Sequence, residues 1–299
     1  MPSLKDYRVR IGSVKNTRKI TSAMKMVAAS KLRQAQARAE AGRPYAKKMT
    51  EALARLVVAV GQRDEKMPLL DGTGQDRKVL FIAVAADRGL CGGFNTALVR
   101  ELRRHISRNL VENREVKVIT VGRKVRDLLK REYPQLIVEH APLVTKYDTA
   151  EKVTAKIIDM FRDGEFDTAH IVYNAFKNVI TQIPSARQLV PFEMSDKMLH
   201  ALESPASSHA GEPKGIYTFE PSAMVLLERL IPQQIAAQVY SVLLEVAAGE
   251  QAARMTAMDN ATRNAGDMIN RLTLSYNRAR QAYITKEVSE IVAGAEASA

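Results

Sequence analysis

Small and apolar residues recur at steps of three, four or seven along the first part of the chain. They are Ile11, Val14, Thr21, Met24, Ala28, Leu32, Ala35 and Ala39. This spacing places them on one face of a helix, as a heptad-like stripe. We therefore expect a long helix over 3–41 and a further helical segment over 45–61. Gly42 and Pro44 should bend or interrupt it, because proline cannot donate the helical hydrogen bond.

A matching stripe runs through the other end of the chain, where no proline follows Pro232. Its residues are Ile235, Val239, Val242, Val246, Ala253, Ala257, Ala261, Ala265, Met268, Leu272, Ser275, Ala279 and Ala282. The simplest arrangement is an antiparallel coiled coil of the two terminal helices. Because most stripe residues are small, this pair should be slender, and its outer faces should meet something else.

Between the two stripes, continuous apolar runs rich in β-formers alternate with helical patterns. Strands are expected at 78–86, 116–122 and 168–176, with weaker ones in 136–143 and 179–192. Helices are expected at 95–109, 123–132 and 149–163. The alternation predicts a Rossmann-like α/β domain with a largely parallel sheet.

The fold class that follows is α plus α/β, with the α/β domain inserted between two coiled-coil helices. Polar, Gly- and Pro-containing stretches mark the boundaries. The expected parts are an N-terminal coiled-coil helix at 1–61, the α/β domain at 77–192, a flexible insertion at 193–215 and a C-terminal coiled-coil helix at 216–299.

Charge is concentrated at the N-terminal end. Residues 1–60 hold 14 Lys and Arg against 3 Asp and Glu, and the remaining residues hold 31 against 30. Such a basic segment favours binding to an acidic partner, which could be nucleic acid, lipid headgroups or an acidic protein surface. Nucleic acid is the less favoured partner, because the basic residues are widely spaced and lack interleaved aromatic residues. A nucleic-acid-binding coiled coil stays an alternative hypothesis.

The stretch AVAADRGLCGGFNT at 83–96 looks like an active site. Its glycine spacing fits neither the P-loop nor the dinucleotide-binding fingerprint, although a helix N-terminus there could hold an anion. Glycines that permit a turn and close packing are the favoured interpretation. Cys91 would need an activating base, and none of the five histidines has a recognisable triad setting. A small enzyme using Cys91 is a second alternative; no catalytic residue, cofactor or metal is expected.

Three stretches carry a specific resemblance. IGSVKNTRKITSAMKMVAASKLRQAQ, DRGLCGGFNT and the long segment beginning EQAARMTAMDN resemble the gamma subunit of F-type ATP synthases, in the family's order. The resemblance implies a rotor whose coiled coil fills an alternating ring of three alpha and three beta subunits. The catalytic sites lie in that ring. The foot of the shaft and the α/β domain would bind the epsilon subunit and the proton-driven c-ring in the membrane, so no nucleic acid or small-molecule substrate is implied.

The resemblance also implies subunit-interface residues. Met24 matches the shaft position near an acidic beta-subunit loop, and Arg88 an arginine that meets a beta subunit. Arg254, Arg280, Gln281 and Thr285 match family residues on the coupling face and in the upper contacts with the beta subunits. Tyr217 and Glu220 match residues at the foot of the shaft, which contacts the membrane ring. Ordinary packing is the alternative for Met24 and Tyr217, and a helix N-terminal charge for Glu220.

The chain departs from the family pattern at three positions. Ala86 stands where a hydroxyl residue is expected, Phe94 where leucine is common, and Gly249 where serine is usual. A glycine inside a helix costs on the order of 1 kcal/mol and could soften the shaft. One cysteine excludes the dithiol switch of the chloroplast relatives. The lack of an evident presequence leads us to expect a peripheral protein on the cytoplasmic face of the bacterial inner membrane.

Overall fold

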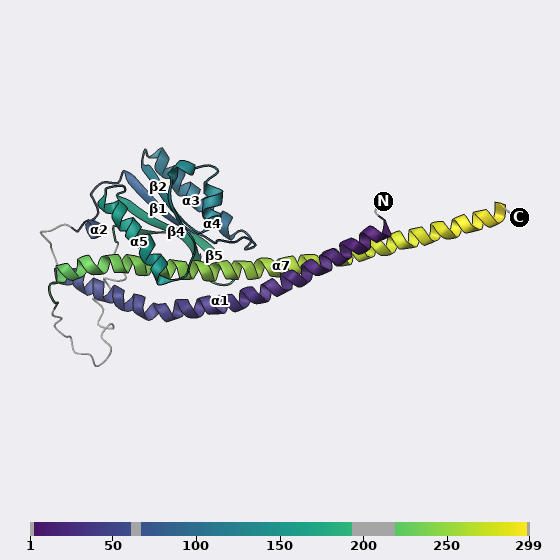
Figure 1. Ribbon diagram of the computed structural model, residues 1–299, viewed down its shortest axis with the longest axis horizontal. Coiled ribbons are helices and arrows are strands. Elements are labelled where there is room, and N and C mark those ends of the chain that lie inside the picture. Colours follow the sequence, from purple (N-terminus) through teal and green to yellow (C-terminus); the bar gives the residue numbers. More distant parts are fainter. Residues whose placement is uncertain (1–2, 61–66, 193–218, 298–299) are drawn as a thin grey trace. The chain divides into compact units, whose positions relative to one another are not determined.

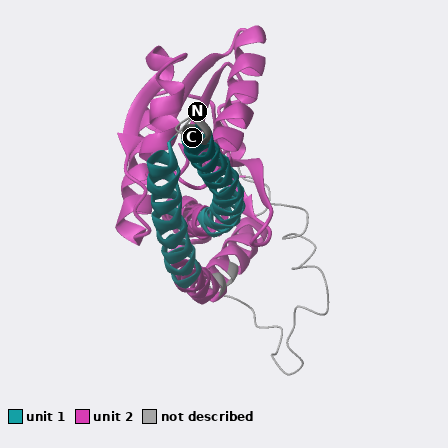
Figure 2. Cartoon of the chain, turned by 90° about the vertical axis from the view of Figure 1, so that its right-hand side faces the viewer, with its two compact units in different colours: residues 1–30, 254–299 teal, residues 31–253 magenta. Residues whose placement is uncertain are grey.

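The computed structural model describes residues 3–60, 67–192 and 219–297. The chain divides into two compact units, coloured separately in Figure 2. Unit 1 consists of Met1–Ser30 with Arg254–Ala299, and unit 2 is Lys31–Ala253.

Unit 1 is a pair of helices. It is formed by the first part of α1 (Leu4–Val60) and the last part of α7 (Ala223–Ala297), seen side by side in Figure 1. The pair is antiparallel, because the residue numbers of the contacting partners decrease along α7 as they increase along α1. The contacts are Arg8 to the hydroxyl of Tyr276 at 2.8 Å, Thr21 to Thr262 at 2.7 Å, and Lys25 to Asp259 at 2.6 Å. The expected antiparallel pairing is confirmed.

The expected stripe on α1 is correct, since all eight of its residues are buried or half-buried. The stripe on α7 is correct as far as Ala265 and then wrong at three positions. Met268, Ser275 and Ala282 are exposed. Leu272 and Ala279 are half-buried as expected, and Ile269 and Tyr276 are half-buried in place of the three exposed positions. Steps of three and four alternate in both sets, but the observed set takes a step of four after Ala265 where the expected set takes a step of three, and either order keeps a heptad-like spacing.

From the sequence, Gly42 and Pro44 were expected to bend or interrupt the helix, and α1 is not interrupted at either residue. It continues through both residues to Val60. Beyond the proline, Leu53 and Leu56 are only 1% and 2% exposed in the core of unit 2. Burial of such side chains stabilises by about 2 kcal/mol each, which offsets the hydrogen bond that Pro44 cannot donate.

The centre of unit 2 is a five-stranded sheet in the order β3-β2-β1-β4-β5. Strands β1 to β4 run parallel to one another, and β5 is antiparallel to β4. The strands are β1 (Lys78–Val84), β2 (Glu115–Val121), β3 (Ile137–Ala141), β4 (Thr168–Phe176) and β5 (Gln182–Val190). The helices around them are α3 (Phe94–Val111), α4 (Arg123–Leu129) and α5 (Tyr147–Arg162). The short α2 (Pro68–Asp71) lies between the ranges expected for the N-terminal helix and the α/β domain, and a 3-10 turn spans Pro134–Leu136.

Alternate side chains of β1 enter two separate cores. Val79, Phe81 and Ala83 pack with α3 and α4 on one face of the sheet. Leu80 and Ile82 pack on the other face, with α5 and the unit 2 portions of α1 and α7. Both faces are therefore covered, which explains the continuous apolar run of this strand. Within the described ranges, no helix is long and apolar enough to cross a membrane.

Candidate functional site

The loop after β1 is tied down by the carboxylate of Asp87. Its Oδ1 accepts a hydrogen bond from the N–H of Arg123 at 2.9 Å, and its Oδ2 accepts one from the N–H of Leu143 at 3.2 Å. These donors follow β2 and β3, so the hydrogen bonds of Asp87 connect the carboxyl ends of β1, β2 and β3. A carboxylate held by two backbone donors has a structural role here.

Cys91 is 2% exposed and lies beside an amide rather than a base. Its Sγ accepts a hydrogen bond from Nδ2 of Asn95 at 3.2 Å. The Oδ1 of Asn95 accepts the N–H of Ala86 at 3.1 Å. The cysteine and asparagine together close the glycine turn, which fits the interpretation of Cys91 as a buried packing residue.

The start of α3 is covered by protein. Phe94, its first residue, is 5% exposed, and its carbonyl accepts Nδ2 of Asn174 at 2.8 Å. A Cβ placed on Gly249 of α7 would lie 3.1 Å from Cε2 of Phe94. In doubly wound sheets the crevice beside such a helix N-terminus is where ligands bind. Here Phe94 and α7 pack at that end of the sheet, which favours the packing interpretation of the glycines over an anion site.

What the loop presents outward is Arg88 and Leu90. Arg88 is exposed, and Leu90 is 64% exposed with a positive φ of 64°. Ile180, in the turn between β4 and β5, is 82% exposed. Because β1 and β4 are parallel neighbours, their carboxyl ends share one edge of the sheet. Arg88 was predicted from the sequence, whereas the two apolar residues were not, because their only signal was their place in turns after buried strands.

Two half-buried histidines pack against the same phenylalanine ring. The rings of His105 and His170 each stand 5.8 Å from the ring of Phe81. Burial lowers the pKa of His170, and His105 adds to this effect. His200 and His209 fall outside the described residues. No group of three or more potential metal ligands occurs among the residues that the structure describes.

In unit 1, Met24 is half-buried in the helix pair. The exposed apolar side chains around it are Ile20 at 59%, Met26 at 66% and Val27 at 55%. Val9 is exposed as well, at 64%. Val9, Ile20 and Val27 are separated by nearly whole numbers of helical turns, so they line one outer face of α1. This outer stripe, which the sequence analysis missed, is distinct from the packed seam.

The remaining candidates of unit 1 lie along α7. Arg254 is half-buried and is not a free donor. Arg280, Gln281 and Thr285 are exposed. The register of the helix pair sets Arg280 opposite Leu4, where α1 begins. These three residues therefore occupy the end of α7 that continues beyond its partner, as Figure 1 shows.

The foot candidates lie in unit 2, at the entry to α7. Glu220 is exposed, two residues before Ser222, whose Oγ accepts the N–H of Val225 at 3.3 Å. Ser222 is thus the helix cap. Tyr217 lies outside the described residues.

The comparisons with known proteins agree along almost the whole chain. The family model for ATP synthase matches residues 3–297. ATP synthase gamma chains of Paracoccus denitrificans and Allorhizobium ampelinum are 50% and 51% identical over 301 aligned positions, covering 99% of this chain and 100% of each relative. The chain belongs to the gamma-chain family of ATP synthases.

Solved structures of the family have the same fold. The central stalk and c-ring structure of the Tetrahymena thermophila mitochondrial ATP synthase contains a chain that is 28% identical, with a TM-score of 0.59 over 81% of this chain and 99% of that one. A chain of the Euglena gracilis mitochondrial enzyme superposes with a TM-score of 0.66 over 98% of this chain and 94% of its own, at 21% identity. The expected fold class of a gamma subunit is confirmed.

Proposed function

We propose that this chain is the central-stalk rotor of a proton-translocating F-type ATP synthase and is itself non-catalytic. The observation that carries the proposal is the end of α7. From Arg280 onward every described side chain of the helix is exposed, although Ile284, Val288 and Ile291 are apolar. A single helix with exposed apolar residues is stabilised when a partner surrounds it.

The partner that fits this helix end is the ring of alpha and beta subunits. Ile284, Val288 and Ile291 follow at steps of four and three, so they form one face that a surrounding protein sleeve can cover. Arg280, Gln281 and Thr285 stand among them as hydrogen-bond donors for the beta subunits. Exposed polar contacts of this kind are individually weak and salt-sensitive, so none would trap a turning shaft.

A second contact with the ring is proposed for the outer stripe of α1. Val9, Ile20 and Val27 present apolar surface on a helix whose exposed charged residues are mostly basic. Met24 is half-buried, so we place this contact on its exposed neighbours Met26 and Val27. Basic side chains beside them suit an acidic loop of a beta subunit.

Unit 2 supplies the other proposed contacts. Arg88 would meet a beta subunit, with Leu90 and Ile180 adding apolar area at the same edge of the sheet. Glu220 and Tyr217 would form the foot on the c-ring, together with the epsilon subunit. Proton flow through the c-ring would turn the shaft and drive the catalytic sites of the beta subunits, at the cytoplasmic face of the bacterial inner membrane.

Reconstitution tests this proposal. The purified chain alone should hydrolyse no ATP, and mixing it with alpha and beta subunits should yield one complex with raised ATPase activity. The paired change Ile20→Ser with Val27→Ser should lower that activity without lowering the melting temperature of the free chain. Val111→Ser, at an 81% exposed site on α3, is the matched control and should leave activity unchanged. Absence of a complex with the unaltered chain would refute the proposal.

A further inference from the structure

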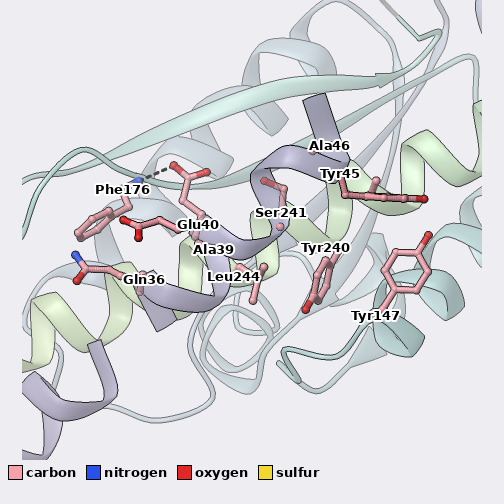
Figure 3. A pocket seen from close by; sticks show the side chains of 14 residues that line it. Gln36, Ala39, Glu40, Tyr45, Ala46, Tyr147, Phe176, Tyr240, Ser241 and Leu244 are labelled. Atoms are coloured by element: carbon pink, nitrogen blue, oxygen red, sulfur yellow. Dashed lines mark hydrogen bonds between the residues drawn. The ribbon is translucent and has the colours of Figure 1, made fainter. Parts of the chain in front are cut away.

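Unit 2 holds a cavity of about 580 Å³ between α1, the start of α5, the end of β4 and α7 (Figure 3). Sites for drug-sized molecules commonly have volumes in this range. The cavity plays no part in the contacts proposed for the rotor. Its two ends differ in chemistry.

One end carries carboxylates. Gln36 and Glu40 of α1 project there, near Phe176 (Figure 3). Glu245 of α7 is fixed at the same end, because its Oε1 accepts the N–H of Phe176 at 2.9 Å. Pro44 has no N–H to donate to the carbonyl of Glu40, so this backbone acceptor lacks its usual helical donor. The end as a whole suits a group that is positively charged and rich in donors.

The other end carries tyrosines. Tyr147 and Tyr240 meet edge to face, with ring centroids 5.6 Å apart, and Tyr45 stands beside them (Figure 3). Burial raises the pKa of Tyr147, and Tyr45 and Glu151 raise it further, so its phenol stays neutral at physiological pH. Neutral phenol rings bind aromatic groups by stacking and attract cations at their faces.

Charge selects the ligand. Among the described residues that line the cavity, two are glutamates and none is a lysine, arginine or histidine. The chain as a whole carries a formal charge of +12. The net positive charge of the protein repels a cation, so binding here would depend on the glutamates and tyrosines that line the cavity. Leu244 and Ala39 between the two ends add apolar contact (Figure 3).

We propose that this cavity binds an amphipathic organic cation, with its ammonium group at Glu40 and Glu245 and its aromatic part at the tyrosines. Such a ligand would bridge α1, α5 and α7 within unit 2. Binding should therefore stabilise this part of the protein against unfolding. The inference is independent of the rotor function, because it concerns the isolated full chain.

Tryptamine is a suitable probe, because the chain contains no tryptophan and indole fluorescence therefore reports only the probe. Its fluorescence anisotropy should rise saturably with the full chain, with a dissociation constant of about 1 mM or below. Combined Glu40→Gln and Glu245→Gln substitutions should raise that constant at least about tenfold. Tyr240→Ala should raise it about fivefold.

Two controls separate the site from general charge effects. Glu228→Gln makes the same charge change at an exposed position of α7 away from the cavity, and should alter the constant less than about twofold. Indole-3-propionate, which is anionic and of similar shape, should not bind the unaltered chain. The inference is overturned if tryptamine does not saturate, if the anion binds equally well, or if the control weakens binding as much as the paired glutamine variant.

Discussion

Phe94 and Gly249 fit each other across the contact between α3 and α7. A Cβ at residue 249 would lie 3.1 Å from Cε2 and 3.5 Å from Cζ of the phenylalanine. These are two of the three positions at which the sequence departs from the family pattern, with a larger residue at one and a smaller residue at the other. The glycine that suggested a softened shaft therefore makes room for a neighbouring ring.

The pair should show energetic coupling. Gly249→Ala alone should give little or no gain in the free energy of unfolding, because crowding against Phe94 offsets the better helix propensity of alanine. In a Phe94→Leu background, the same change should stabilise the protein by about 1 kcal/mol. Urea denaturation of the four proteins in this cycle gives the coupling. Additive effects would show that the contact does not explain the glycine.

Cys91 should matter for packing only. Cys91→Ser keeps a small acceptor beside Asn95 and should support full ATPase activity in the reconstituted complex. Cys91→Ala should lower the free energy of unfolding by about 1 kcal/mol, through the lost volume and the lost acceptor, with the same activity. Loss of activity in the serine variant at unchanged stability would support the alternative of an enzyme that uses this thiol.

Asp167 should make stability depend on pH. Burial alone raises its pKa, but hydrogen bonds from the N–H groups of Arg77 and Lys78 and the hydroxyl of Thr73, each 3.0 Å, outweigh burial and lower the pKa overall. A lowered pKa in the folded state gives stability that is complete above the unfolded value of about 3.9 and is lost as pH falls through the folded value.

Substitution of this carboxylate tests the dependence. Asp167→Asn should destabilise by about 1–3 kcal/mol at pH 7, with the difference narrowing below about pH 4. Asp163→Asn, at an exposed position nearby, is the control and should show little change at any pH. A destabilisation by Asp167→Asn that stayed constant down to about pH 2 would contradict the assigned role.

Pro44 should lower the stability of α1 relative to a residue that can donate a backbone hydrogen bond. Pro44→Ala restores an N–H for the carbonyl of Glu40 and should raise the free energy of unfolding by up to about 3 kcal/mol. Thermal unfolding followed by circular dichroism measures the gain. Ala46→Ser is the control. It replaces one helix-compatible residue by another, two positions after the proline, and it restores no hydrogen bond. Unchanged or lowered stability in the alanine variant would mean that the proline fits its site better than a regular helix would.

Much of the fold could be predicted because the signals were local and redundant. Strand 168–176 was placed as observed, since an apolar run between polar turns leaves little choice. The eight stripe positions on α1 were correct for the same reason. Continuation of the helix through Pro44 could not be predicted, because it depends on distant packing of Leu53 and Leu56. Met268 was assigned to the seam and Ile269 was not, because only the partner helix decides between adjacent apolar residues.

The candidate site was harder to predict than the fold. Arg88, Arg280, Gln281 and Thr285 lie where contact is possible, but their roles in an interface stay predictions. Leu90, Ile180 and Val27 could not be selected, because an apolar residue gives the same signal whether it is buried or exposed. The pairing of Phe94 with Gly249 joins residues that are distant in the sequence and requires the fold.

Single-molecule rotation tests the central claim most directly. Cys91 is 2% exposed, so a cysteine introduced at Val111, which is 81% exposed, would take a gold-rod probe selectively. The complex would be immobilised through its beta subunits and supplied with ATP. We predict continuous rotation of the probe in one direction, which stops when ATP is removed. ATP hydrolysis at an undiminished rate with a stationary probe would contradict it.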